Sequence, residues 1–151
     1  MRAVVQRVGR AHVSVNQKIT GQIGAGLLIL LGVTHEDTAE DVNYLVNKVL
    51  QIRVFSDADG KMNLSLIDTG GGVLVVSQFT LYASTARGNR PSYTRAAGPE
   101  KAKSLYEMFN GSLAQKLDRP VATGIFGADM QVEMCNDGPV TIILDSLQKE
   151  F

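Results

Sequence analysis

The sequence predicts one domain of mixed α/β (α+β) structure, residues 1–151, in which about two helices pack on a largely antiparallel sheet that curls towards a barrel. Most apolar segments are short, rich in valine and bounded by glycine or polar turns, which is typical of β-strands. Only two stretches repeat their apolar residues at helical spacing. Because strands and helices do not alternate regularly, a doubly wound parallel sheet is disfavoured.

The first third of the chain is expected to be a meander of strands. Gly9 separates the first two strands, and the polar residues 16–18 form a turn before the third. The fourth strand, which follows Gly24 and Gly26, is apolar throughout, as fully buried strands are. The four strands are predicted at residues 3–8, 11–15, 19–23 and 27–33.

A helix is predicted next, with Thr38 as its N-cap and acidic residues in its first turn. Its apolar residues recur at helical spacing and are Val42, Leu45, Val46, Val49 and Leu50. A short strand at 52–55 then ends at a turn that contains Asp57, Asp59 and Gly60.

The second half begins with the strongest strand pattern of the chain, residues 73–81, and continues in a polar loop at 83–98. Pro99 suits the first position of a second helix. The apolar residues of this helix are Ala102, Leu105, Tyr106, Phe109 and Leu113. The closing strands are predicted at 130–134 and 140–144, with a turn at 136–139 between them.

Composition places the chain among globular proteins, with 44% hydrophobic residues, 20% charged residues and a formal net charge of zero. The longest apolar run, residues 27–31, is far too short to cross a bilayer. Cys135 is expected to be a small core residue, and as the one cysteine it cannot form an internal disulfide. We therefore expect a cytoplasmic protein without a membrane partner.

Basic residues gather locally although the net charge is zero. One basic cluster has only Glu100 as a counter-charge and consists of Arg87, Arg90, Arg95, Lys101 and Lys103. A local positive field attracts phosphates even on a neutral protein. The alternative is that these side chains only keep the surface soluble, and their spacing does not decide between the two.

Motifs for nucleotide and metal chemistry are incomplete. The segment 24–26 lacks the third glycine of a dinucleotide loop, and Ala39 stands where a zinc protease helix beginning at His35 needs its second histidine. His12 and His35 both favour structural roles, because no hydroxyl is placed near either of them. We expect no metal and no cofactor, so any catalysis must use backbone groups, bound water or the substrate itself.

Two further segments are not explained by these interpretations. Ser77-Gln78-Phe79-Thr80-Leu81 ends an apolar strand in polar residues, and Asn136-Asp137-Gly138-Pro139-Val140-Thr141 has the composition of a turn. Singly, each has an ordinary structural explanation. Together, in a chain of this length, they resemble the signature pair of the bacterial and eukaryotic D-aminoacyl-tRNA deacylase family. The resemblance extends through residues 2–8, 20–28, 55–57, 87–92 and 126–132.

The resemblance implies an editing hydrolase that cleaves the ester of D-aminoacyl-tRNA to free D-amino acid and tRNA. It also implies a homodimer with two active sites at its interface, where a cis Gly-Pro of one subunit reaches into the pocket of the other. Here that bond is Gly138-Pro139, whose backbone would exclude an L-residue while a D side chain points away. Because glycine has no side chain to exclude, glycyl-tRNA is expected to be a further substrate.

The resemblance assigns the opposite, catalytic wall to Ser77, Gln78, Phe79 and Thr80, near the ester and the terminal adenosine, with backbone N–H groups stabilising an oxyanion. Water, with or without help from the 2′-hydroxyl of the last ribose, is favoured as the nucleophile over Thr80, to which no base is assigned. The substrate pocket is expected to include Arg7, Phe126, Met130 and Asn136. Arg7 is expected to support the Gly138-Pro139 loop, and the basic cluster to meet tRNA phosphates. For Phe126 and Met130, core packing is the equal alternative.

The main alternative is a dimer that binds DNA or RNA without hydrolysis, because some relatives have been assigned DNA-binding roles. Those relatives carry C-terminal extensions, whereas this chain stops at Phe151, which favours the editing enzyme. A ribonuclease is disfavoured because the sequence shows no histidine pair or acidic metal cluster. A non-catalytic interaction module would leave the paired signatures unexplained.

Overall fold

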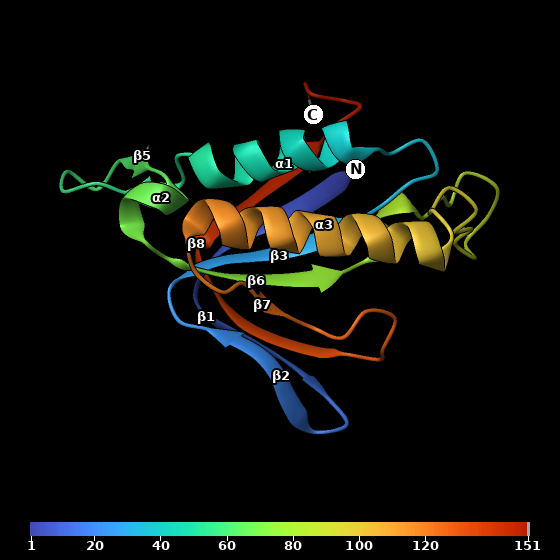
Figure 1. Cartoon of the computed structure of the whole chain (residues 1–151), viewed down its shortest axis with the longest axis horizontal. Coiled ribbons are helices and arrows are strands. Elements are labelled where there is room, and N and C mark those ends of the chain that lie inside the picture. Colours follow the sequence, from blue (N-terminus) through green and yellow to red (C-terminus); the bar gives the residue numbers. More distant parts are fainter. Residues whose placement is uncertain (151) are drawn as a thin grey trace.

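The computed structural model describes residues 1–150 and shows one mixed α/β domain with a nearly closed, barrel-like sheet (Figure 1). The strands are β1 (Arg2–Val15), β2 (Lys18–Ile23), β3 (Gly26–Gly32), β4 (Phe55–Ser56), β5 (Met62–Leu64), β6 (Gly72–Ser77), β7 (Ala122–Thr123) and β8 (Gln131–Asp145). The helices are α1 (Ala39–Gln51), α2 (Leu66–Thr69) and α3 (Pro99–Leu117), with a 3₁₀ helix η1 (Phe79–Tyr82). Both long helices were predicted; the four-residue α2 was not.

The main sheet has the strand order β2-β1-β3-β6-β7, and β8 also pairs with β1. Antiparallel pairing joins β1 to β2, β3 and β8. The predicted meander is confirmed only in part, because β3 pairs with β1 and not with β2, which precedes it in the chain. The pairs β3–β6 and β6–β7 are parallel, which departs from the predicted antiparallel pattern. Parallel neighbours need long crossover connections, and α1 and α3 lie within those connections.

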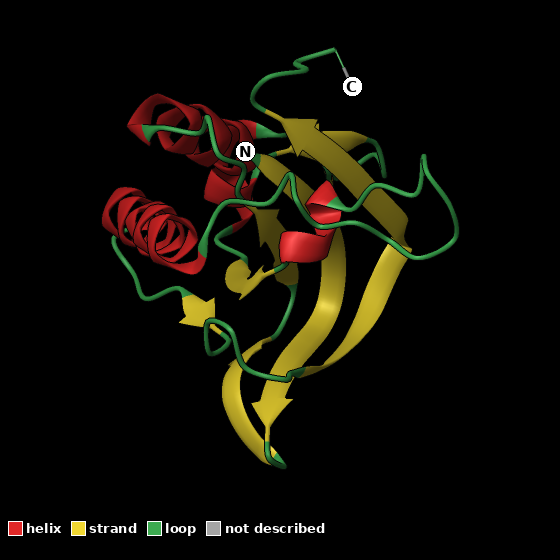
Figure 2. Ribbon diagram, turned by 90° about the vertical axis from the view of Figure 1, so that its right-hand side faces the viewer, coloured by secondary structure: helices red, strands yellow, loops and turns green. Residues whose placement is uncertain are grey.

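The two long helices cover the same face of the sheet (Figure 2). Thr38 caps α1 through a capping box with Asp41, and Pro99 occupies the first turn of α3, as predicted. The apolar stripe of α1 is fully buried, and Phe109 and Leu113 of α3 are completely inaccessible to solvent. Burial of these stripes against β3 and β6 forms the main core.

Several strand predictions were wrong at their boundaries. Residues 3–8 and 11–15 belong to one strand, β1, in which Gly9 is an extra residue at a bulge and not a break. Of the predicted strand at 52–55 only Phe55 lies in a strand, β4. The predicted strand at 73–81 ends at Ser77, two residues before η1 begins. The predicted turn at 136–139 lies inside the single long strand β8.

Cys135 is exposed on β8, which corrects its expected place in the core. β8 pairs with β1 along one of its two edges. No strand among residues 1–150 pairs with its other edge. Among those residues, too, no helix combines the length and the apolar composition needed to span a membrane.

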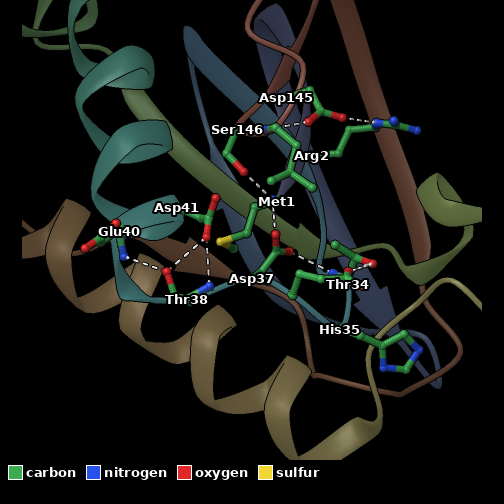
Figure 3. A network of polar contacts seen from close by, with 12 residues as sticks. Met1, Arg2, Thr34, His35, Asp37, Thr38, Glu40, Asp41, Asp145 and Ser146 are labelled. Carbon is green, nitrogen blue, oxygen red and sulfur yellow. Dashed lines mark hydrogen bonds and ion pairs between the residues drawn. The ribbon is translucent and has the colours of Figure 1, made fainter.

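A polar network ties the ends of β1 and β8 to the connection before α1 (Figure 3). The α-amino group of Met1 contacts Asp37 and Ser146, all of them buried. Arg2 donates from Nε to Asp145 at 2.9 Å and from Nη1 to the carbonyl of Leu81 at 2.9 Å. The network therefore reaches η1, whose first two residues, Phe79 and Thr80, belong to the predicted catalytic wall.

Burial acts to raise the pKa of Asp145. Backbone N–H groups of Gln148 and Leu147, together with Arg2, outweigh that effect and hold its pKa below the ordinary value. Asp145 therefore remains an anion near neutral pH, which keeps Arg2 attached to it.

Candidate active site

A pocket of about 580 Å³ opens where β3 and β6 end, beneath the start of α3. Its lining is mostly apolar, and Asp129 is the one charged residue among the described residues that line it. Five residues predicted for the site meet here from distant parts of the chain: Ser77, Gln78, Phe79, Phe126 and Met130. A concave apolar site with a few converging polar groups is the usual form of a small-ligand pocket.

One wall of the pocket is the turn that follows β6. Ser77 pairs with Leu31 at the end of the strand, and the N–H of Gln78 donates to the Leu31 carbonyl at 2.8 Å. The chain then bends over Gly32, where an added Cβ would lie 3.0 Å from the Gln78 carbonyl oxygen. The absence of a side chain at Gly32 thus lets η1 fold back onto the sheet.

The first two N–H groups of η1, on Phe79 and Thr80, make no hydrogen bond to any described residue. The first N–H groups of a helical turn have no partner within the turn and are available to an acceptor outside it. The side-chain amide of Gln78 donates to the Thr80 hydroxyl. That amide is no base, so nothing in the described chain activates Thr80 for nucleophilic attack.

Aromatic rings form two further sides of the pocket. Phe79, 57% exposed, meets Tyr93 edge to face with 5.0 Å between ring centroids. Deeper in the pocket Tyr106 lies against Phe126 with 5.6 Å between centroids. The Tyr106 hydroxyl donates to the Val75 carbonyl at 2.9 Å, and burial raises the pKa of Tyr106, so this ring is a neutral structural floor.

Tyr93, Tyr106 and Asp129 line the pocket but were not predicted as site residues. Tyr106 was assigned to the apolar stripe of its helix, where it also belongs. Tyr93 lies in the polar loop, which has no periodic pattern from which its orientation can be deduced. Its position is fixed by contacts of the next residues: the carbonyls of Thr94 and Arg95 accept hydrogen bonds from His35 and Thr34.

The second signature segment forms a wide bulge in β8. Gln6 of β1 pairs with Thr141, and Val8 pairs with Asn136, so residues 137–140 lie opposite Arg7 alone. The Gly138–Pro139 peptide bond is cis, and Gly138 has a φ of +121°, in the region that favours glycine. Both residues are exposed.

Arg7 and Asn136 hold this bulge from its two sides. Arg7 donates from Nε to the Asp137 carbonyl at 3.2 Å, lies 3.0 Å from the Asp137 carboxylate, and donates from Nη1 to the Val54 carbonyl at 2.6 Å. Asn136 accepts from the N–H of Val140 at 3.1 Å and donates to the Thr141 hydroxyl at 3.1 Å. Neither residue, nor Gly138 or Pro139, lines the pocket of its own chain.

The basic cluster is exposed along the loop before α3 and on the first turns of α3. Lys101 contacts the carbonyl of His35, and Lys103 lies 3.8 Å from Glu107. Ala97 and Pro99 line the pocket, and they lie between Arg95 and Lys101 in the chain. Arg95 and Lys101 are therefore close in sequence to the rim of the pocket. No group of metal-ligating side chains is found within residues 1–150.

Comparison with known proteins identifies the family of this chain. Residues 4–145 match the family model described as D-Tyr-tRNA(Tyr) deacylase. A D-aminoacyl-tRNA deacylase of Akkermansia muciniphila is 57% identical over 150 residues, which cover 99% of this chain and 100% of that protein. One of Chloroflexus aurantiacus is 59% identical over 148 residues, covering 98% of this chain and 92% of that protein.

Two solved structures share the fold. The one titled c-Myc DNA Unwinding Element Binding Protein has a TM-score of 0.90 and 42% sequence identity, covering 96% of this chain and 98% of that one. A probable eukaryotic D-amino acid tRNA deacylase has a TM-score of 0.79 and covers 95% of this chain and 97% of that one. Its identity of 18% makes it evidence for the fold alone.

Proposed function

We propose, from the premise that this chain belongs to the D-Tyr-tRNA(Tyr) deacylase family, that it hydrolyses the ester bond of D-aminoacyl-tRNA to give free D-amino acid and tRNA. The observation that carries the proposal is the turn at 77–80, of which Ser77, Gln78 and Phe79 line the apolar pocket and Thr80 does not. The backbone N–H groups of Phe79 and of Thr80, the residue that follows it, have no partners in the described chain. Such a site binds an aminoacyl ester and offers donors to the oxyanion formed when its carbonyl is attacked.

The chemical step uses water as the nucleophile. Water adds to the ester carbonyl carbon, the negative charge on the carbonyl oxygen is stabilised by the N–H groups of Phe79 and Thr80, and the bond to the ribose oxygen then breaks. The ribose oxygen leaves with a proton, so that the products are a carboxylate and an intact tRNA 3′ end. Each donor of this kind contributes about 3–4 kcal/mol to transition-state stability. Thr80 needs no part in a covalent step.

Handedness is read by the bulge of a second subunit in this proposal. The Gly138–Pro139 segment is exposed and lies outside the pocket of its own chain, so it needs a second copy to meet a pocket. Its backbone carbonyls would stand beside the chiral carbon, where an L side chain collides and a D side chain points away. Selection by collision accepts many D side chains while excluding the L-series.

The homodimer has support in the edge of β8. This strand is 15 residues long and pairs on one edge only within the described chain. It exposes Val132, Met134 and Ile143, and Leu147 beyond its end is 60% exposed. A long edge strand with apolar side chains favours association, and a second copy would cover it while bringing the bulge to a pocket.

The basic cluster is proposed to hold the tRNA backbone beside the pocket, in the cytoplasm where charged tRNA is found. Neutralising Arg87, Arg90 and Lys103 together should weaken tRNA binding and flatten its dependence on salt, since each phosphate contact contributes about 0.7–0.9 to the slope. A salt slope equal to that of the unmodified protein would remove this assignment.

Glycyl-tRNA is proposed as a second substrate, because glycine has no side chain that could collide with the bulge. The check is deacylation of glycyl-tRNA at an enzyme concentration that clears D-Tyr-tRNA. Complete inertness towards glycyl-tRNAs of every isoacceptor would contradict it.

The function itself is tested by deacylation of D-Tyr-tRNA and L-Tyr-tRNA, side by side, with metal-free protein. Loss of the D-form alone, with release of free D-tyrosine, is the expected result. Cleavage of both forms would keep the hydrolase and reject the role of the bulge. Binding of tRNA or DNA without cleavage of either would favour a non-catalytic nucleic-acid-binding dimer.

A further inference from the structure

The bulge at 137–140 is an unusual wall, because only its last residue, Val140, is half-buried and packs against the main core, and the three residues before it are exposed. Asp137, Gly138 and Pro139 are all exposed, and none of them belongs to a core cluster. Regular pairing with β1 stops on both sides of it, at Asn136 and at Thr141. The conformation of residues 137–139 must therefore be set by side-chain hydrogen bonds at those two ends, together with the packing of Val140.

Asn136 is placed to do this, since it closes the bulge on itself. Its side-chain oxygen accepts the N–H of Val140 at 3.1 Å, and its side-chain nitrogen donates to the Thr141 hydroxyl at 3.1 Å. The two bonds cross the bulge. The bond to Thr141 joins the last paired residue before the bulge to the first paired residue after it. Both polar ends of the amide are used, its oxygen as an acceptor and its nitrogen as a donor.

We propose that Asn136 is a positioning residue for stereoselectivity: by closing the bulge it holds the Gly138–Pro139 carbonyls rigid enough to exclude L-aminoacyl groups. It does not line the pocket, so it acts through the bulge and not by touching substrate. Rejection of an L-substrate by collision requires a rigid bulge. Acceptance of a D-substrate does not, because its side chain points away from the bulge. Loosening the bulge should therefore admit L-substrates before it harms D-substrates. This inference rests on the proposed deacylase function.

Arg7 secures the other flank and is no substitute for Asn136. Its guanidinium binds Asp137, at the start of the bulge, and the carbonyl of Val54. At the end of the bulge, the N–H of Val140 donates to Asn136 instead. Removing the amide leaves the start of the bulge fixed, while its end keeps only the packing of Val140 against the core. The expected result is a hinged wall and not an unfolded strand, because β1–β8 pairing continues through residues 141–145.

The test compares kcat/KM for D-Tyr-tRNA and L-Tyr-tRNA in four variants. Asn136→Ala removes both hydrogen bonds and should lower the D/L ratio at least about tenfold, chiefly through faster cleavage of the L-form. Thr141→Val removes one partner and should lower it about threefold. Asn136→Asp can still accept from Val140 and from the Thr141 hydroxyl, so its ratio should stay near that of the unmodified protein. Gln131→Ala, an exposed change on the same strand, is the matched control.

An unchanged D/L ratio in folded Asn136→Ala would overturn the proposal, as would an equal fall in Gln131→Ala. If Asn136→Ala does not fold, Thr141→Val decides alone, and an unchanged ratio there is equally contradictory. Amide exchange at Val140 separates this result from a failure of the proposed function. Its exchange should accelerate about tenfold in Asn136→Ala whatever the catalytic activity, and unchanged exchange would refute the closing role of Asn136.

Discussion

The pocket wall at 77–80 and the bulge at 137–140 are the two places where a strand of this fold is interrupted by its signature residues, and they are built in opposite ways. The wall follows a buried strand and is held by packing over Gly32 and a backbone bond to Leu31. The bulge is exposed and is held by Arg7 and Asn136. Both present backbone groups to the outside, N–H donors in one case and carbonyls in the other.

In the proposed mechanism, this difference lets one fold combine handedness with tolerance of many side chains. Backbone donors in a packed wall are fixed in place, as stabilisation of a developing charge requires. Backbone carbonyls in an exposed bulge can be set against a second subunit. Neither element contacts the substrate through groups specific to one amino-acid side chain. In the proposed mechanism the site therefore recognises the shape of the aminoacyl group and not its side-chain chemistry.

The largest effect is expected for Phe79→Pro, which removes one N–H donor of the wall. That N–H has no partner in the described chain, proline is tolerated at the first position of a helical turn, and Gln78 before it is outside the α region that a following proline disfavours, with φ −143° and ψ 83°. We expect kcat for D-Tyr-tRNA to fall about 10²–10³-fold. Phe79→Ala, which loses the ring but keeps the N–H, is the control. Equal losses in the two variants would place the contribution in the ring.

Gly138→Ala should produce the next largest effect, by displacing the bulge. Its Cβ would lie 2.9 Å from Nη2 of Arg7 and 2.9 Å from a methyl group of Val140, at a φ of +121° that alanine disfavours. A shift of about 1 Å beside a reacting centre can cost about 100-fold in rate, which is the expected fall in kcat/KM for D-Tyr-tRNA. Gly127→Ala is an informative comparison, because φ there is +76° but no atom lies within 4 Å of an added Cβ. A larger loss in Gly127→Ala would contradict the assignment.

Tyr93→Ala should raise KM for D-Tyr-tRNA about tenfold while kcat changes little. Tyr93 supports the exposed ring of Phe79 at the pocket rim, and stacking of a base on an aromatic ring contributes about 1–3 kcal/mol. Tyr93→Phe keeps the ring and should restore the original KM. A fall in kcat with KM unchanged would show that the ring pair serves the chemical step and not binding.

Thr80→Val should have the smallest effect, below about tenfold in kcat. It removes the hydroxyl that accepts from the Gln78 amide but retains the backbone N–H. Loss of activity to the uncatalysed rate, in a folded Thr80→Val protein of unchanged oligomeric state, would instead favour a covalent mechanism.

Sequence patterns predicted both long helices and the buried strand β3, because apolar periodicity follows burial closely. The five predicted residues that meet at the pocket came from the family resemblance and not from periodicity. Parallel pairing of β3 with β6 was missed, since strand partners separated by some 40 residues leave no local pattern. The chain around 136–139 was predicted as a turn because its composition is that of a turn, and the long strand on either side overrides that local preference. Tyr93 was missed because its place depends on loop contacts with Thr34 and His35 that are distant in sequence.

The most direct test of the account is to mix two inactive proteins, Phe79→Pro and Gly138→Ala, after dissociation and reassociation. If the pocket of one subunit works with the bulge of another, each mixed dimer has one site in which both elements are intact. With random pairing the mixture should then regain about a quarter of the unmodified activity on D-Tyr-tRNA. Mixed dimers that form, as mass spectrometry would show, yet remain as inactive as their parents would contradict the account.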